Sequence, residues 1–129
     1  MCEFDLRHRN NQLYTTEYLS PILKEMLRKE TLFLPTPDYM DTQAELKPKM
    51  RGQALEWISE VAHKFKLLPE TLFLAINYMD RFLSQVNVVK GDLQLVLVTA
   101  LEIASKYEEI YPPSLEDYIF ICDNAYTSD

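Results

Sequence analysis

Histidine and cysteine, two residue types that often perform catalysis, are scarce in this sequence, and none is grouped with a suitable partner. His8 lies in a polar N-terminal segment and His63 on the expected surface of a helix, so neither is placed to activate a serine nucleophile. Cys2 and Cys122 stand near opposite ends of the chain, with no Cys-x-x-Cys pair and no histidine at a metal-ligand spacing. They predict two free thiols in a reducing compartment.

The most concentrated acidic feature is the adjacent pair Glu108 and Glu109. Neighbouring residues on a helix point about 100° apart, so this pair is not expected to act on one substrate as an acid and a base. A solvated helix end is the simpler interpretation. Glycine is scarce, with 2 in 129 residues, which speaks against phosphate-binding glycine-rich loops. We therefore expect a protein that is not an enzyme, with no catalytic residue, no metal and no cofactor.

The composition is that of one folded domain. The chain has 129 residues, of which 47 % are hydrophobic, and this proportion is ordinary for a packed domain. Lys and Arg number 13 against 20 Asp and Glu, and the net charge of −7 argues against a nucleic acid or an anionic membrane as the main partner. The longest apolar run, near residues 95–101, is far shorter than the ~20 residues of a membrane-spanning helix.

Hydrophobic periodicity divides the chain into three parts. Residues 1–13 lack an apolar period and are expected to form a flexible tail. Residues 14–48 are expected to hold an N-terminal helix and then an extended, proline-rich connector. Residues 49–129 hold the remaining helices, for which the apolar stripes predict the ranges 49–65, 68–84, 90–109 and 114–122. No segment has the pattern of a strand, so the predicted fold class is all-α.

The start of the N-terminal helix has two interpretations. An apolar stripe begins near Thr15 or Thr16 and continues to about Lys29. Because Pro21 is best tolerated in the first turn of a helix, a later start with Ser20 as the N-cap is the alternative.

Later segments carry clearer signals. The stretch at 90–109 is apolar on nearly all sides, which is typical of a helix surrounded by other helices. Ser114 and Asp117 have the spacing of a capping box at a helix start. Apolar residues of the connector are expected to pack against the helices that it passes, and these are Leu34, Tyr39, Met40 and Leu46.

Several ordered blocks of sequence resemble one known family. They are MRGQALEWISE at 50–60, KLLPETLFLAINYMDRFLS at 66–84, LQLV at 93–96, ASKYEEIYPP at 104–113 and DNAYT at 123–127. In this order they resemble the N-terminal cyclin box of the cyclin family. The upstream stretches EYL at 17–19 and PDYM at 37–40 resemble the segment before the box in B-type, mitotic cyclins. The resemblance covers roughly residues 14–129.

The resemblance implies a particular helical bundle. A cyclin box has five helices with one buried at the centre, and the 90–109 helix is the candidate for that position, preceded by an extra N-terminal helix. In the family a fifth box helix follows the DNAYT block, and a second helical repeat follows the box. Neither is found before Asp129, so the box at 49–129 is expected to be incomplete. The missing helix is expected to leave an apolar groove on the central helix, with poor stability or self-association as the consequence.

The resemblance also implies a function. Cyclins are regulatory subunits that bind and activate a cyclin-dependent protein kinase, without catalysis of their own. For this chain it implies control of cell-cycle progression at G2/M, in the nucleus and cytoplasm. The alternative is a helical adaptor of the transcription type, which keeps the cyclin fold but activates no kinase.

The family pattern assigns kinase-binding positions to this sequence. Lys106 is expected to donate to backbone carbonyls near the kinase C-helix, and Tyr107 to pack on that helix. Further candidates are Ile103, Glu108 and Glu109, with Tyr18 and Ile22 on the N-terminal helix. The alternative for Ile103 is a position in the hydrophobic core. The alternative for Tyr18 and Ile22 is packing within the chain.

Two further sets of residues follow from the resemblance. A docking patch for Arg-x-Leu segments of substrates or inhibitors is expected at Met50, Gln53, Ala54, Trp57, Glu60 and Gln94. The family usually has larger apolar residues where this chain has Gln53 and Ala54, so the patch is expected to be shallow, polar and weak. Arg51 and Asp80 are expected to form a structural ion pair.

Overall fold

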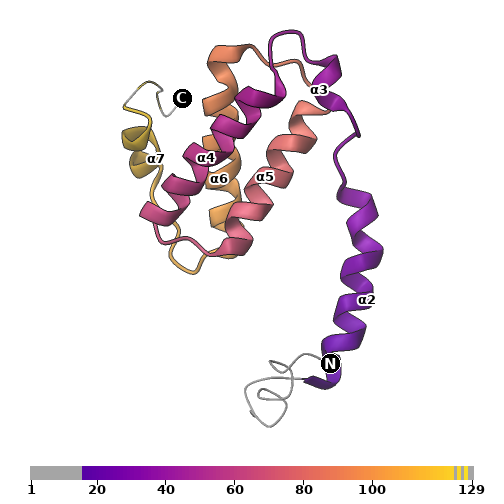
Figure 1. Cartoon of the computed structure of the whole chain (residues 1–129). Coiled ribbons are helices and arrows are strands. Elements are labelled where there is room, and N and C mark those ends of the chain that lie inside the picture. Colours follow the sequence, from indigo (N-terminus) through magenta and orange to yellow (C-terminus); the bar gives the residue numbers. More distant parts are fainter. Residues whose placement is uncertain (1–15, 124, 126, 128–129) are drawn as a thin grey trace. The chain divides into compact units, whose positions relative to one another are not determined.

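The structure, a computed structural model, describes residues 16–123, 125 and 127. The chain forms two compact units, Met1–Leu34 and Pro35–Asp129, and each is described by itself. Every regular element in the described residues is a helix (Figure 1), which confirms the all-α prediction. The predicted tail at 1–13 and the helix start at Thr15 lie outside the described residues. The connector residues from Pro35 onward belong to the second unit.

The first unit is built around one amphipathic helix. Its elements are η1 (Thr16–Tyr18), α2 (Leu19–Glu30) and η2 (Thr31–Phe33). Tyr18 is the N-cap of α2, so the alternative start with Ser20 as the N-cap is wrong. Pro21 lies in the first turn, where backbone N–H groups have no partner within the helix, and it therefore breaks no hydrogen bond.

The second unit contains the remaining helices. They are α3 (Tyr39–Thr42), α4 (Pro48–Lys64), α5 (Pro69–Leu83), η3 (Lys90–Asp92), α6 (Leu93–Glu108) and α7 (Leu115–Ile121). The four predicted ranges match α4, α5, α6 with η3, and α7 to within about one residue at each end. Proline at the first position of α4 and of α5 accounts for two of the sharp starts, because its fixed φ suits that position.

Helix α6 lies at the centre of the second unit. It packs along most of its length against α5 and also contacts α4 and α7 (Figure 1). The buried side of α6 consists of Leu93, Leu97, Val98, Ala100, Leu101, Ala104 and Ser105. The prediction of a buried central helix is confirmed, but burial is not complete: Leu95, Thr99 and Ile103 form an exposed strip on α6.

Helix α7 closes one side of α6. Its capping box is present as predicted, since the Asp117 N–H donates to Ser114 Oγ and the Ser114 N–H donates to Asp117 Oδ2. The Tyr118 hydroxyl is buried and donates to Ser105 Oγ on α6 at 2.9 Å. The Tyr118 ring meets Phe65 edge to face at 5.4 Å between centroids. These contacts fix α7 against both α4 and α6.

The connector is more structured than predicted, because it contains the short helix α3. Asp38 precedes α3 in the left-handed region at φ 57°, which aspartate tolerates better than most residues. The buried Gln43 amide joins the connector to the loop after α5: its Nε2 donates to the carbonyls of Leu83 and Val86, both at 2.7 Å. Its Oε1 accepts from the Val88 N–H at 3.1 Å.

Of the four connector residues that were expected to pack, three pack in or against the core. Tyr39 and Leu46 are buried, and Met40 is half-buried. Leu34 is exposed, so the prediction for that residue is wrong.

Arg51, Asp80 and Tyr39 form a cluster that joins α4, α5 and α3. Arg51 binds Asp80 with both ends of its guanidinium, Nε to Oδ1 at 2.8 Å and Nη2 to Oδ2 at 2.7 Å. The Tyr39 hydroxyl donates to the same Oδ1 and accepts from Arg51 Nε at 3.1 Å. The hydrogen bond to Asp80 raises the pKa of Arg51. Burial raises the pKa of Tyr39 to about 12, and the bond to Asp80 adds to this, so Tyr39 remains a donor at neutral pH.

Removal of either partner of this ion pair is expected to destabilise the fold. Arg51→Ala leaves the carboxylate of Asp80 largely buried and without its cation, and Asp80→Ala does the reverse. Loss of one partner of a fully buried pair costs about 3–5 kcal/mol, and we expect about 2–4 kcal/mol here because the Arg51 side chain is partly exposed. Circular dichroism during urea unfolding measures the change. The exposed Glu56 on α4 provides the control, Glu56→Ala. Unchanged unfolding of both cluster variants would contradict a structural role.

Candidate functional site

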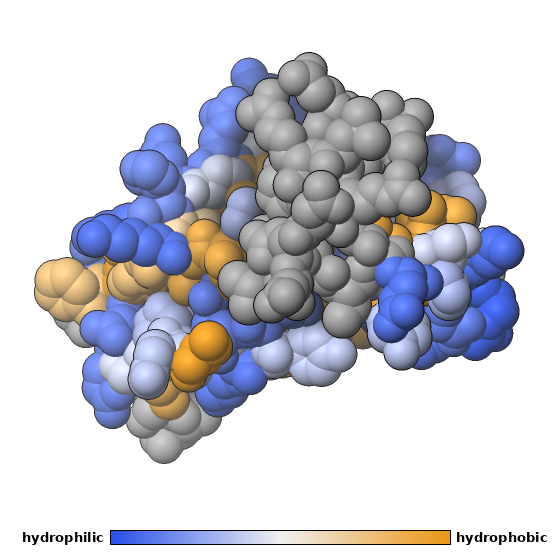
Figure 2. All heavy atoms as spheres, turned by 90° about the horizontal axis from the view of Figure 1, so that it is seen from below, coloured by the Kyte–Doolittle hydropathy of each residue, from blue (hydrophilic) through white to orange (hydrophobic). Residues whose placement is uncertain are grey.

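The C-terminal end of α6 presents large apolar side chains to solvent. Tyr107 is 75 % exposed, and Ile110 and Tyr111, which follow the helix, are 86 % and 91 % exposed. Ile103, one turn earlier on α6, is about half exposed. The structure therefore does not place it in the hydrophobic core, which was the alternative to a binding role. We call Ile103, Lys106, Tyr107, Glu108, Ile110 and Tyr111 the α6-end surface. Figure 2 shows one face of the molecule, on which hydrophobic residues (orange) are exposed among hydrophilic ones (blue).

Lys106 supplies the positive charge of the α6-end surface. Its Nζ lies 2.6 Å from Oε1 of Glu102, one turn back on the same helix. The Lys106 side chain is mostly exposed, whereas that of Glu102 is mostly covered. An ammonium group has three donors, so this pairing leaves donors for a partner.

Two residues of the α6-end surface, Ile110 and Tyr111, were missed by the sequence analysis. The signal was present in the apolar pair that stands directly before Pro112 and Pro113. Two consecutive prolines prevent helix continuation, so side chains just before them leave the helical stripe and lose its burial pattern.

The two adjacent glutamates have different surroundings. Glu108 is exposed, as expected for a solvated helix end. Oε1 of Glu109 instead accepts from the Leu68 N–H at 2.7 Å and from the Thr71 hydroxyl at 2.6 Å. Leu68 and Thr71 stand at the start of α5, where backbone N–H groups lack helical partners and negative charge is favoured. Glu109 therefore anchors the end of α6 to α5 and supports the α6-end surface from within.

Tyr18 and Ile22 belong to the first unit. Both side chains are about half exposed.

A hollow of about 270 Å³ lies between α4 and α6. Five of the six predicted docking residues line it: Met50, Gln53, Ala54, Trp57 and Gln94. Lys90 and Leu93, which the sequence analysis missed, also line it, and both stand just before Gln94 in the chain. Glu60 is exposed on α4 and is not among the lining residues. The lining of this hollow is mixed in polarity, because Gln53, Gln94 and Lys90 stand among its apolar side chains.

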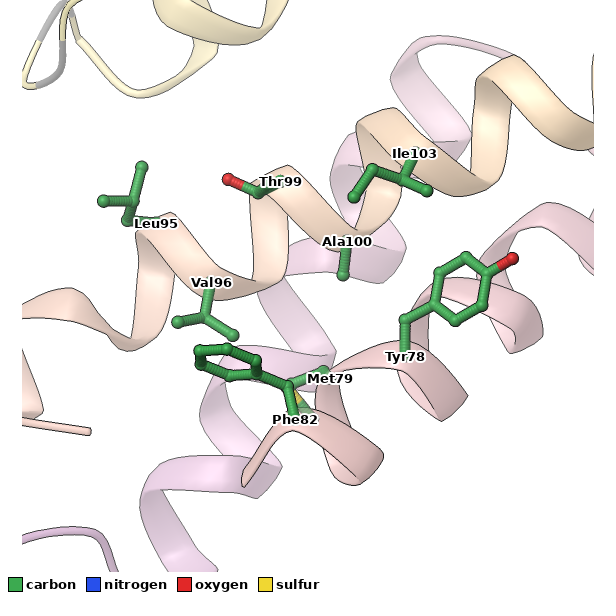
Figure 3. Close-up of a pocket in the computed structure, with 8 residues that line it drawn as sticks. All are labelled: Tyr78, Met79, Phe82, Leu95, Val96, Thr99, Ala100 and Ile103. Atoms are coloured by element: carbon green, nitrogen blue, oxygen red, sulfur yellow. The ribbon is translucent and has the colours of Figure 1, made fainter. Parts of the chain in front are cut away.

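A second depression, of about 360 Å³, runs between α5 and α6 (Figure 3). We call it the α5/α6 groove. Its lining is Tyr78, Met79, Phe82, Leu95, Val96, Thr99, Ala100 and Ile103, which is almost entirely apolar.

The described residues contain no cluster of three or more histidine, cysteine or carboxylate side chains that would hold a metal ion. Within the same residues, no helix combines the length and the apolarity that crossing a membrane requires. Cys122 is a buried free thiol, and burial raises its pKa.

Comparison with known proteins gives a consistent family match. The family described as "Cyclin, N-terminal domain" matches residues 21–129. The chain is 47 % identical over 125 residues to Cyclin-B2-2 of Oryza sativa subsp. indica, which covers 97 % of this chain and 30 % of the relative. It is 43 % identical over 127 residues to G2/mitotic-specific cyclin-B of Hydra viridissima, covering 98 % and 32 %. The chain thus spans about a third of the length of these relatives.

The fold also matches a solved structure. The X-ray structure of a viral cyclin from herpesvirus saimiri aligns with a TM-score of 0.75 at 21 % identity, over 82 % of this chain and 46 % of that one. This likeness supports the predicted cyclin-box bundle.

The neighbouring glutamates allow a matched test of the anchor at the end of α6. Glu109→Ala removes the acceptor of a backbone N–H and of the buried Thr71 hydroxyl, and we expect a loss of about 1–3 kcal/mol in the free energy of unfolding. Glu108→Ala removes an exposed side chain and is expected to change it by less than about 0.5 kcal/mol. Urea unfolding of the two variants measures both values, and equal losses would contradict the anchoring role.

Proposed function

The chain belongs to the cyclin family, and from this premise we propose that it binds and activates a cyclin-dependent protein kinase as a regulatory, non-catalytic subunit. The relatives named G2/mitotic-specific cyclins support a role in cell-cycle progression at G2/M. The chain spans only about a third of the length of such relatives. We therefore assign a role to each described surface separately.

The α6-end surface carries the proposal. It combines exposed aromatic and aliphatic side chains with one lysine, and tyrosine is among the residues enriched at the energetic centres of interfaces. The supporting helix is held in place, since Glu109 binds the start of α5 and Ser105 accepts from Tyr118. A rigid surface loses little conformational entropy when a partner binds.

The proposed mechanism follows from the chemistry of this surface. Tyr107 and Ile103 offer apolar area for the C-helix of the kinase, and Lys106 offers donors to carbonyl groups at a helix end, which lack partners within their own helix. Binding energy that is available only when the C-helix stands in its active position shifts the kinase towards that state. In that state the Lys–Glu ion pair of the kinase forms.

Substitution of Lys106 tests the proposal. We expect the chain to bind a purified cyclin-dependent kinase and to raise its phosphorylation of a histone substrate. Lys106→Ala is expected to raise the dissociation constant at least about tenfold, or about 1.4 kcal/mol. Lys49→Ala is the control, since Lys49 is an exposed lysine on α4. Equal binding of both variants would contradict the assigned surface, and binding without activation would identify an adaptor instead.

We further propose that the hollow between α4 and α6 is a docking site of weak affinity for Arg-x-Leu segments. Gln53 and Ala54 provide less apolar area than leucine side chains would, and Lys90 in the lining opposes a positively charged segment. Glu60, the candidate partner of the arginine, lies outside the lining.

A gain of affinity tests this docking proposal. Gln53→Leu with Ala54→Leu enlarges the apolar lining, and we expect a fluorescently labelled Arg-x-Leu peptide to bind at least about tenfold more tightly than to the unmodified chain. A peptide with both motif residues changed to alanine controls for non-specific binding. Tight binding of the Arg-x-Leu peptide to the unmodified chain would contradict a weak site.

A further inference from the structure

One charged side chain lines the hollow between α4 and α6, and it belongs to Lys90. The other lining residues are apolar or carry an amide, and they are Met50, Gln53, Ala54, Trp57, Leu93 and Gln94. The apolar ones pack in or against the hydrophobic core, and we call them the apolar lining. No described carboxylate belongs to the lining. A ligand in this hollow therefore meets an apolar surface with a single cation beside it.

Lys90 is held in place by the connector. Its backbone N–H donates to Oε2 of Glu45 at 3.0 Å, and the Val88 N–H donates to Oε1 of the buried Gln43 at 3.1 Å. Because Glu45 stands three residues before the first residue of α4, this contact places Lys90 at the end of the hollow where α4 begins. A side chain on a restrained backbone loses less conformational entropy when a ligand binds.

The ammonium group of Lys90 is free to bind a partner. The residue is exposed, and within the part of the chain that the structure describes its ammonium forms no ion pair. The Glu45 carboxylate contacts the backbone of Lys90, and neither Glu45 nor Asp92, the acidic residue of η3, lines the hollow. An ammonium forms stronger hydrogen bonds with a carboxylate than with a neutral acceptor, so the lysine favours an acidic ligand.

The charges around the hollow leave its Lys90 end basic. Lys47 and Lys49 are exposed and precede the lining residues of α4 in the chain. Glu56 and Glu60 are exposed farther along α4 and are not among the lining residues. The net charge of −7 acts over longer distances, and at physiological ionic strength it is largely screened beyond about 8 Å. The charge nearest to a bound segment therefore decides which segments are preferred.

We propose that the hollow between α4 and α6 selects segments in which an acidic residue stands near a leucine. The leucine covers the apolar lining, and its burial supplies most of the binding free energy. The carboxylate meets Lys90 and selects the segment by its charge. This inference deepens the docking role proposed above and rests on it, and it ranks acidic segments above Arg-x-Leu segments, which Lys90 opposes.

A titration with three matched peptides tests the selection. They carry Glu-x-Leu, Gln-x-Leu or Arg-x-Leu in the same flanking sequence, and a second set has the two residues in reversed order, because a segment can bind in either direction. Nuclear magnetic resonance of the amide groups of the chain reports both the dissociation constant and the place of binding. An exposed ion pair contributes little, so we expect the Glu peptide to bind about two- to fivefold more tightly than the Gln peptide in at least one order. The Arg peptide is expected to bind most weakly, and the signals of Lys90 and Leu93 are expected to shift.

Substitution of Lys90 tests the source of the selection. Lys90→Glu is expected to reverse the ranking, so that the Arg peptide binds more tightly than the Glu peptide. Lys90→Gln is expected to remove the difference between them, and it keeps the test valid if circular dichroism shows that Lys90→Glu is unfolded. Lys64→Glu is the matched control and is expected to keep the original ranking, because Lys64 is an exposed lysine in the last turn of α4, outside the lining.

Two kinds of failure are distinguishable. Absence of binding by the Glu peptide, equal binding of the Glu and Gln peptides, tighter binding of the Arg peptide to the unmodified chain, or an unchanged ranking in both Lys90 variants would overturn the selection alone. If no peptide shifts the signals of the hollow, even when Arg-x-Leu is added to the variant with Gln53→Leu and Ala54→Leu, the docking role and the selection are overturned together.

Discussion

The bidentate ion pair between Arg51 and Asp80 is the constraint on which the rest of the bundle depends. Asp80 is buried, and burial of a carboxylate is tolerated only when a cation and further donors compensate for its lost hydration. Arg51 on α4 and Tyr39 on α3 provide them. The pair therefore permits only a narrow range of distances and angles between α4 and α5, and α6 packs against both of these helices.

A second carboxylate restrains the opposite end of α5. Asp80 lies near the C-terminal end of this helix, and Glu109 accepts hydrogen bonds from Leu68 and Thr71 at its start. Since α5 is the main neighbour of α6, these two contacts position every surface that α6 offers to a partner. The end of α6 is aromatic and cationic, the hollow towards α4 is mixed in polarity, and the groove towards α5 is apolar. A rigid framework with chemically distinct surfaces suits a protein that acts by binding.

Local signals in the sequence were sufficient to predict most of the helices. Apolar periodicity placed α4, α5 and α6, and the residue types at Ser114 and Asp117 placed the start of α7. The ion pair between Arg51 and Asp80 and most residues that line the hollow between α4 and α6 were predicted from the resemblance to cyclins. The spacing of residues in the sequence did not predict them.

What the sequence did not predict depends on contacts between distant residues. Gln43 bonds to backbone groups some 40 residues away, and this stabilises a connector that was expected to be extended. Glu109 resembles its neighbour Glu108 in sequence, and only the position of α5 gives it an internal role. Ile110 and Tyr111 are exposed because α6 ends before the two prolines that follow them. The periodicity of apolar residues does not predict this exposure.

Hydrogen exchange of the chain with and without a cyclin-dependent kinase tests the account most directly, because it locates the contact without any substitution. Slower exchange is predicted in peptides that cover the C-terminal half of α6 and continue through Ile110 and Tyr111. Peptides of α4 that line the hollow, around Gln53 and Trp57, are predicted to exchange as in the free chain. Protection confined to α4, or no protection at the end of α6, would contradict the account.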